Sequence, residues 1–148
     1  MSTPLRSIHR KLPSKAEACA RLIGELLEVL ESEGWSKDDA FAIRMAVEEA
    51  VMNAIKHGNQ EAVDKQVDVN LQFFADRFYG KIDDQGHGFR PEDVPDPTRD
   101  ENLEKTSGRG VALIRSFVDE VHYNQSGNSI ELIKYRSDGD EDPPAAGE

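Results

Sequence analysis

The stretch EAVMNAIKH, residues 49–57, decides how the rest of the chain is interpreted. It has the apolar spacing of the end of an amphipathic helix, and it carries a carboxylate, Glu49, four residues before a carboxamide, Asn53. Side chains at i and i+4 lie one turn apart on the same edge of a helix. Glu49 can therefore face a water or a hydroxyl while Asn53 offers an oxygen to a hard cation such as Mg²⁺. Taken alone, an acid and an amide on a helix flank are more often simply solvated, so the remaining sequence must decide.

The composition describes one globular domain. A chain of 148 residues can bury about two thirds of its unfolded surface, and hydrophobic residues make up 37% and charged residues 32% of it. No apolar run approaches the about 20 residues that span a bilayer, and no signal segment opens the chain. The single cysteine, Cys19, excludes an internal disulfide and is expected on a buried helix face. We therefore expect a cytoplasmic protein without a membrane partner.

The charge of the chain argues against nucleic acid as a partner. The net charge is −11, and five of the acids stand in Ser137–Glu148, so the other residues still carry −6. Such a surface repels a polyanion. A small anionic ligand remains compatible, because a few backbone amides and one or two cations bind phosphate locally.

The first part of the chain reads as a strand followed by a helix. Ser7–Leu12 is the expected strand, and Ser14 with Glu17 three residues later forms a capping box that starts the helix. Apolar residues recur at helical spacing through this segment: Cys19, Leu22, Ile23, Leu26, Leu27 and Leu30. Gly34 is the expected C-cap.

A second helix is expected from Ser36, which forms another capping signature with Asp39, to about His57. Its core-facing stripe consists of Ile43, Val47, Ala50, Val51 and Ala54. Glu49 and Asn53 lie on the flank of this stripe, so they can border a pocket without facing bulk solvent.

An antiparallel pair of strands follows the second helix. Val67–Phe73 alternates between apolar and polar residues, and Asp76-Arg77 is the expected hairpin turn into a second strand at Phe78–Asp83. Gly86–Gly110 has no useful period and is long for a connection, which is typical of a lid or a disordered loop.

The C-terminal part completes a single domain over residues 1–136. A helix is expected at Val111–Phe117 and strands near Val121–Asn124 and Ser129–Tyr135. Residues 137–148 are acidic and rich in proline, glycine and alanine, so we expect a disordered acidic tail there.

Two glycine motifs could complete a nucleotide site. In Asp84-x-Gly86-x-Gly88, after a strand, the carboxylate can accept a hydrogen bond from an exocyclic amine and the glycines let the backbone approach a flat ring such as adenine. Gly108-x-Gly110 opens a helix whose free amides can bind phosphates, with charge added by Arg109 or Lys105. The bland alternatives are an ordinary turn and a flexible hinge.

Together and in this order, the three motifs resemble the N, G1 and G2 boxes of the GHKL ATPases, the superfamily of gyrase and the sensor histidine kinases. Within it, residues 48–57 (EEAVMNAIKH) and 107–111 (SGRGV) resemble the anti-sigma-factor serine/threonine kinases. The resemblance covers about Leu5–Arg136. It implies an α+β two-layer sandwich, the histidine-kinase-like ATPase fold, with helices over a mixed, mainly antiparallel sheet and ATP between the helices and a lid.

The resemblance also implies roles for single residues. Glu49 would be the general base for the acceptor hydroxyl, and Asn53 would be the Mg²⁺ ligand. Asp84 would accept a hydrogen bond from the N6 amine of adenine. The other implied ATP contacts are Gly86 and Gly88 at the base, and Lys105, Gly108, Arg109 and Gly110 at the phosphates. The chain departs from the Gly-Thr-Thr-like segment of the family, because Gly127-Asn128-Ser129-Ile130 stands there, so a hydroxyl contact would fall to Ser129.

By the same resemblance the protein would be a serine/threonine kinase using ATP and Mg²⁺ and acting as an anti-sigma factor. It would phosphorylate a STAS-type anti-anti-sigma protein, hold a sigma factor in its other state, and form a homodimer. The alternative from another class is an ATP-gated binding module of the same fold without kinase activity. A relative that has lost ATP is disfavoured, because all three boxes are present.

Overall fold

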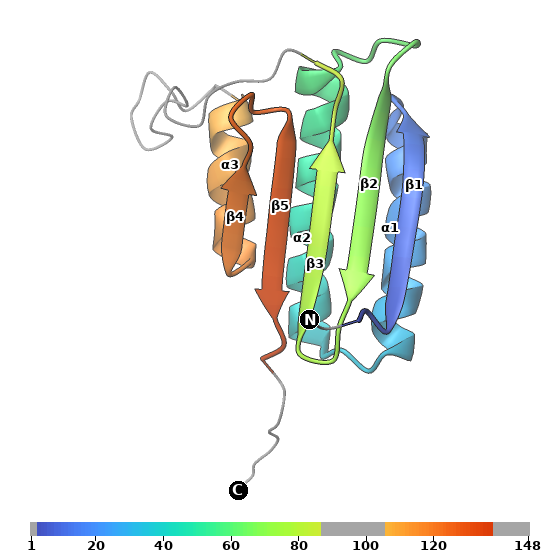
Figure 1. Cartoon of the computed structure of the whole chain (residues 1–148), viewed down its shortest axis with the longest axis vertical. Coiled ribbons are helices and arrows are strands. Elements are labelled where there is room, and N and C mark those ends of the chain that lie inside the picture. Colours follow the sequence, from blue (N-terminus) through green and yellow to red (C-terminus); the bar gives the residue numbers. More distant parts are fainter. Residues whose placement is uncertain (1–2, 87–105, 138–148) are drawn as a thin grey trace, which may run out of the picture.

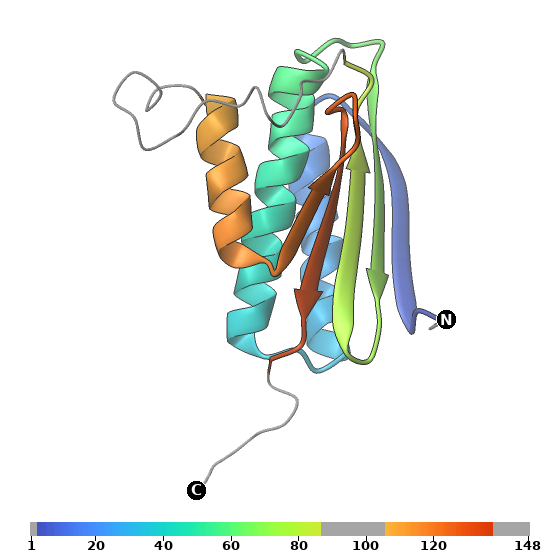
Figure 2. The ribbon, with the colours of Figure 1, turned by 60° about the vertical axis from the view of Figure 1, so that its left-hand side comes forward.

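The computed structural model describes residues 3–86 and 106–137, and within these ranges three α-helices cover one face of a five-stranded sheet (Figures 1 and 2). The elements are β1 (Arg6–Pro13), α1 (Ala16–Ser32), α2 (Lys37–Asn53), the π-helical turn η1 (Ala54–Gly58), β2 (Gln66–Phe73), β3 (Arg77–Asp83), α3 (Thr106–Phe117), β4 (Glu120–Tyr123) and β5 (Ser129–Tyr135). None of the described helices is both long and apolar enough to cross a bilayer.

The strands lie in the order β1-β2-β3-β5-β4, and each described neighbouring pair is antiparallel. β3 and β4, which α3 connects, run in the same direction but are separated by β5 (Figure 1). The two-layer α+β fold is therefore confirmed. In line with the mainly antiparallel sheet that was expected, every described pair is antiparallel, because the insertion of β5 removes the one parallel contact that the helical crossover could have made.

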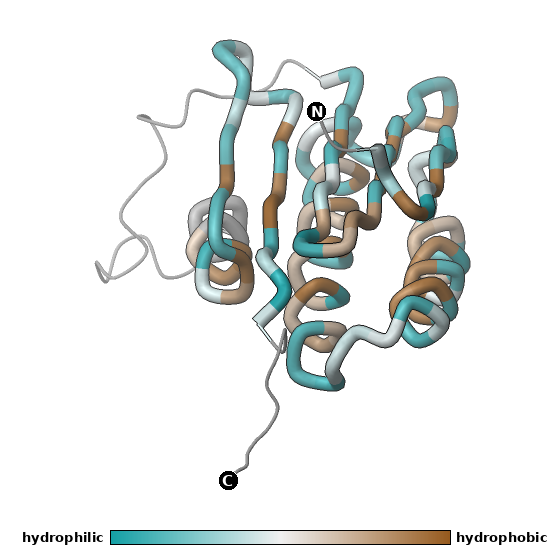
Figure 3. The backbone as a smooth tube through the Cα atoms, turned by 60° about the horizontal axis from the view of Figure 1, so that its bottom comes forward, coloured by the Kyte–Doolittle hydropathy of each residue, from teal (hydrophilic) through white to brown (hydrophobic). Residues whose placement is uncertain are grey.

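The core lies between the two layers and follows from the alternation in the strands. In β2, Val67, Val69 and Leu71 are completely buried while the intervening side chains are half-buried. Figure 3 shows this alternation as brown and teal segments along the strands. Leu26 of α1 and Ile43 of α2, both 0% exposed, pack against this face. Full burial of one such side chain contributes about 1.5–3 kcal/mol.

The corner between α1 and α2 has the local structure expected from the sequence. Gly34 adopts a left-handed φ of 76°, and the backbone N–H of Trp35 donates to the carbonyl of Leu30 at 3.0 Å, which is the Schellman pattern of a helix end. Ser36 is the N-cap of α2, because its side chain accepts the backbone N–H of Asp39 at 3.1 Å. These two caps fix the direction in which α2 leaves the corner.

Two expectations about α1 are wrong. The helix begins at Ala16 after Lys15, and Ser14 makes no cap. Ser14 is buried, and its hydroxyl donates instead to the carbonyl of Lys65 at 2.8 Å, since the start of β2 lies beside it. Leu27, which was expected on the buried face, is 37% exposed, and Val29 is buried instead.

The end of α2 widens into η1. The backbone N–H of Asn59 donates to the carbonyl of Ala54 at 2.8 Å, five residues back, which defines the π-helical turn. The next two residues, Gln60 and Glu61, adopt left-handed φ angles of 53° and 58°. The expected stop at Gly58-Asn59 is thus confirmed, and the widened turn carries Gly58 toward the end of β3.

The C-terminal helix starts earlier than expected, and most of the expected lid and tail lies outside the described residues. α3 begins at Thr106, five residues before the expected start, so Gly108 and Gly110 belong to its first turns. Most of the expected lid lies at residues 87–105, outside the described part of the chain. Ser137 is described and bonds to Asp39, whereas residues 138–148 are not, so the disordered tail stays a prediction.

Candidate nucleotide site

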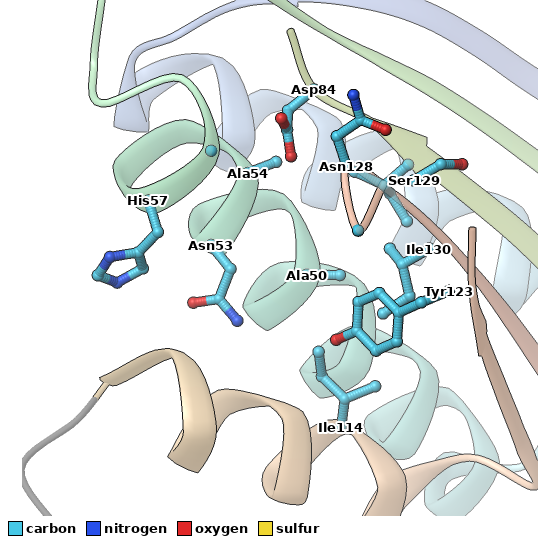
Figure 4. Close-up of a pocket in the computed structure, with 13 residues that line it drawn as sticks. Ala50, Asn53, Ala54, His57, Asp84, Ile114, Tyr123, Asn128, Ser129 and Ile130 are labelled. Carbon is cyan, nitrogen blue, oxygen red and sulfur yellow. The ribbon is translucent and has the colours of Figure 1, made fainter. Parts of the chain in front are cut away.

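A cavity of about 230 Å³ opens where the ends of several elements meet. The end of α2, η1, the turn of the β4–β5 hairpin and the residues that follow β3 surround it, with α3 on the remaining side (Figure 4). Its lining residues are Ala50, Asn53, Ala54, His57, Gly58, Ile82, Asp84, Ile114, Tyr123, Gly127, Asn128, Ser129 and Ile130. Elements far apart in the sequence therefore build one site.

Asp84 is the charged group of this cavity. Its Oδ1 accepts the backbone N–H of Gly86 at 2.8 Å, and its own N–H donates to the carbonyl of Asn128 at 2.9 Å. Burial raises the pKa of the Asp84 carboxyl, with a smaller contribution from the charge of Asp83, and the Gly86 hydrogen bond opposes the rise. Within residues 3–86 and 106–137, no hydrogen bond to Oδ2 of Asp84 is present.

Gly58 and Gly86 form a close contact around Asp84. A Cβ on Gly58 would lie 2.3 Å from Cγ of Asp84, and a Cβ on Gly86 would lie 1.9 Å from the carbonyl oxygen of Gly58. Neither position accepts a side chain without displacement of the backbone or of the carboxylate. The sequence interpretation assigned Gly86 to the base pocket but treated Gly58 only as a helix stop. The position of Gly58 directly after His57, at the end of the 49–57 stretch, was the sequence signal that could have assigned it to the site.

The helix α2 contributes Asn53 and, one turn further, His57. Figure 4 shows both side chains on the side of α2 and η1 that faces the first turns of α3. Glu49 is half-buried one turn before Asn53, about 6 Å along the axis, and is not among the residues that line the cavity. The structure therefore brings Asn53 and Asp84 together and leaves Glu49 beside the cavity.

The turn between β4 and β5 forms the wall opposite η1. Oδ1 of Asn124 accepts the backbone N–H groups of Gly127 at 2.7 Å and Ser129 at 3.2 Å, which fixes the turn. Gly127 has a left-handed φ of 75° that favours glycine. Ser129 lines the cavity, as the sequence allowed. Asn128 lines it too, and its contact with Asp84 is long-range and has no sequence signal.

The floor of the cavity is apolar. Ala50, Ile114 and Ile130 surround the ring of Tyr123 (Figure 4). Burial raises the pKa of the Tyr123 hydroxyl to about 12, so this side chain stays neutral at physiological pH. An apolar cavity with one carboxylate near its rim suits a flat heterocycle that carries an amino group.

The expected phosphate residues are placed only in part. Gly108, Arg109 and Gly110 lie in the first turns of α3, whose N-terminal end is close to Asn53 and His57 in Figure 4. Free backbone amides at such an end bind phosphate oxygens. Gly88 and Lys105 lie outside the described residues.

Among the described residues there is no cluster of three or more His, Cys, Asp or Glu side chains that could hold a metal ion. Mg²⁺ bound with a nucleotide takes one or two protein oxygens and completes its shell with phosphate oxygens and water. The carboxamide of Asn53 offers one oxygen of this kind.

Comparison with known proteins agrees with this geometry. Residues 12–134 match the model of the histidine kinase-like ATPase domain. The chain belongs to this family. The match spans every residue that lines the cavity, from Ala50 to Ile130.

Similar proteins of this ATPase family carry the name serine-protein kinase RsbW. The chain is 35% identical over 136 residues to the one from Staphylococcus epidermidis and 32% identical over 137 residues to one from Staphylococcus aureus, with 86% of each chain covered. It is 29% identical to the one from Bacillus velezensis, covering 91% of this chain and 89% of that one.

A solved structure of the RsbU and RsbW domains of a Mycobacterium tuberculosis protein has the same fold. It aligns with a TM-score of 0.58 at 18% identity and covers 90% of this chain. The ATPase domain described here spans 33% of that longer chain, so this likeness concerns the fold alone.

Proposed function

We propose that the protein is an ATP- and Mg²⁺-dependent serine/threonine kinase that acts as an anti-sigma factor. It phosphorylates a STAS-type anti-anti-sigma protein and binds a sigma factor in its other state. The observation that carries the proposal is the cavity that joins Asp84, Asn53 and the glycine contact of Gly58 with Gly86. The similarity to proteins named serine-protein kinase RsbW supports the choice of substrate class.

Each residue has a separate task in this proposal. Oδ2 of Asp84 accepts a hydrogen bond from the exocyclic amine of adenine, since Oδ1 is already bonded to Gly86. Asn53 supplies an oxygen to Mg²⁺, and the amides at the start of α3 bind phosphate oxygens. Bound with Mg²⁺, ATP supplies the phosphoryl group. Glu49 accepts the proton of the acceptor hydroxyl from its place one turn before Asn53.

The decisive experiment separates binding from transfer. Labelled ATP, Mg²⁺ and a STAS-type protein encoded beside this one are expected to give a phosphorylated serine or threonine. Asn53→Ala should abolish Mg²⁺-dependent ATP binding, whereas Glu49→Ala should spare binding and remove transfer. Glu48→Ala, at the adjacent half-buried acid of α2 that pairs with Arg44, is the matched control. Transfer that survives both the Glu49 and the Asn53 changes would refute the assignment.

A second candidate function is a binding module that ATP gates without phosphoryl transfer. The position of Glu49 favours it, because this acid lies outside the residues that line the cavity. The two candidates differ in one measurement, partner release on addition of ATP. If Glu49→Ala still releases its partner completely, the gated module describes the protein better than the kinase.

The proposal includes a homodimer, for which the resemblance to anti-sigma kinases is the only support. Light scattering on the purified protein at several concentrations measures the mass directly. A chain mass of 16.5 kDa at all concentrations would remove the dimer from the proposal.

A further inference from the structure

Asn59 follows η1 and is a buried polar side chain whose hydrogen bonds are complete. It is 1% exposed. Its Nδ2 donates to Oγ of Ser14 and to the carbonyl of Gln66, both at 3.0 Å, and its Oδ1 accepts the backbone N–H of Gln85 at 2.7 Å. A carboxamide satisfied on both sides in the interior is a rigid connection.

These bonds join the ends of three strands to the end of α2. Ser14 follows β1, Gln66 begins β2 and Gln85 follows β3. A return bond strengthens the connection, because the backbone N–H of Gln66 donates to Oε1 of Gln85 at 2.6 Å. The register of the β2–β3 pair thus fixes where the turn Asp84-Gln85-Gly86 lies relative to η1.

The backbone beside Asn59 is strained. Gln60 and Glu61 both adopt left-handed φ angles, which are unfavourable for residues with a Cβ. Such a conformation persists only where the surrounding structure imposes it, and it occurs preferentially at functional sites. Here the strain accompanies the inward position of Asn59, since the π-helical turn and these two residues together turn its side chain into the core.

The turn that Asn59 holds packs closely against Gly58. The α-carbon of Gly86 approaches Gly58 so closely that an added Cβ would lie 1.9 Å from its carbonyl oxygen. Gln85, the residue bonded to Asn59, stands between Asp84 and Gly86. A shift of the Gln85 amide therefore displaces the Asp84 carboxylate on one side and the glycine contact on the other.

We propose that Asn59 is a positioning residue of the nucleotide site, which holds the Asp84 turn against Gly58 and thereby sets its selectivity for adenine over guanine. This inference rests on the proposed ATP function. A carboxylate held in place accepts the amine of adenine but meets the carbonyl oxygen that guanine carries at the same position, so the selectivity depends on a fixed carboxylate. Asn59 touches no ligand and acts through Gln85.

The first test replaces Asn59 by alanine and measures ATP and GTP binding by calorimetry. The ratio of GTP to ATP dissociation constants should fall about 10-fold, the size expected when one buried hydrogen bond no longer fixes the site. Amide hydrogen exchange of Gln85 should become faster in the protein without nucleotide. Ser14→Ala is the matched control, because it removes a bond of Asn59 on the side away from the cavity. It should lower stability while leaving the GTP to ATP ratio within about 2-fold of the parent.

A second variant, Asn59→Asp, keeps the oxygen that accepts the Gln85 N–H and loses the donors to Ser14 and Gln66. It should be less stable yet retain the parent ratio of GTP to ATP dissociation constants. The oxygen that accepts the Gln85 N–H is still present, and the added negative charge weakens the binding of both nucleotides alike. If Asn59→Ala does not fold, this variant decides. An Asn59→Asp protein with a reduced ratio, or an Asn59→Ala protein with the parent ratio and parent Gln85 exchange, would overturn the inference.

The test stays separate from the kinase proposal. Neither measurement needs a phosphoacceptor, so a protein that binds ATP and transfers nothing still answers the question. If the parent protein binds neither nucleotide, the ATP function fails and the selectivity role fails with it, whereas faster Gln85 exchange in Asn59→Ala would still establish the connection between Asn59 and the turn.

Discussion

Two aspartates at opposite ends of the molecule, Asp39 buried and Asp84 half-buried, have pKa values shifted in opposite directions. Asp39 lies at the start of α2 and Asp84 at the end of β3, near the other end of that helix (Figure 1). Burial disfavours the charge of both carboxylates, but the pKa of Asp39 is nevertheless lowered while that of Asp84 is raised. The difference lies in the donors that the protein supplies to each.

Asp39 has donors on both oxygens. Its Oδ1 accepts the hydroxyl of Ser137 at 2.6 Å, its Oδ2 accepts the Ser137 N–H at 2.9 Å, and the ammonium of Lys134 lies 3.4 Å from Oδ1. From the part of the chain that the structure describes, Asp84 receives one donor, the backbone N–H of Gly86 on Oδ1. A carboxylate satisfied by its own chain holds the fold together, whereas one left incompletely satisfied in a cavity can bind a ligand.

The largest expected effect is a loss of stability on substitution of Asp39. Asp39→Asn should lower the free energy of unfolding by about 3 kcal/mol, because Lys134 and Ser137 lose a charged acceptor in the interior. ATP affinity should not change. Urea unfolding measures the first effect and calorimetry the second. Asp38→Asn, an exposed acid in the same turn, is the control and should have little effect.

The corresponding change at the other end, Asp84→Asn, should act on binding and not on stability. Loss of a hydrogen bond to a charged acceptor costs about 1.5–3 kcal/mol, so ATP should bind about 10- to 100-fold more weakly. The apo protein should be no less stable than the parent, because a partly desolvated charge is removed. Asp83→Asn, at a half-buried acid on the outer face of the sheet, serves as control. Unchanged ATP affinity in Asp84→Asn would show that the Asp84 carboxylate does not bind the nucleotide.

A methyl group at the contact between Gly58 and Gly86 should lower the free energy of unfolding by somewhat less than Asp39→Asn does. Gly86→Ala places a methyl group against the carbonyl of Gly58 and should destabilise the protein by about 1–3 kcal/mol while weakening ATP binding. Gly24→Ala makes the same chemical change in α1, where nothing lies within 4 Å of the added methyl, and should stabilise by about 0.5–1 kcal/mol. Thermal unfolding of the two variants with and without ATP checks both signs.

A fall in pH should protonate the two aspartates in a fixed order, Asp84 before Asp39. Because the pKa of Asp84 is raised above its usual 3.8, Asp84 protonates first as the pH falls, and ATP affinity should decrease while the protein is still folded. Asp39 has a lowered pKa, so its contribution to stability is complete above pH 3.8 and is lost only as the pH falls through the lower folded value. Calorimetry and circular dichroism over the same pH series test this order; unfolding that precedes the loss of binding would contradict it.

The smallest expected effect comes from Ser137→Ala, which removes one donor from Asp39 and leaves Lys134 in place. The free energy of unfolding should fall by about 1 kcal/mol. ATP binding should be unaffected, since Ser137 follows the end of β5 that is remote from the cavity (Figure 1). A larger loss would mean that Ser137 carries most of what fixes the charge of Asp39.

Local patterns predicted the elements well where the decisive contacts lie within a few residues. The cap at Ser36, the glycine stop at Gly34 and the alternation of Val67–Phe73 are of this kind, and the structure contains all three. The early start of α3 at Thr106 was missed, because Gly108 and Gly110 weaken the helical signal. Ser14 was misassigned because its true partner, Lys65, is distant in sequence.

The sequence by itself determined the helices, the strands and the spacing that puts Glu49 and Asn53 on one edge of α2, since helix and strand periodicity act over one or two turns. Only the tertiary structure decided which side chains share the cavity. It brought Gly58 against Gly86, placed Asn128 on Asp84 and turned Asn59 toward three strand ends. These contacts depend on the register of the sheet and on the widened turn η1, which long-range packing imposes and local spacing does not encode.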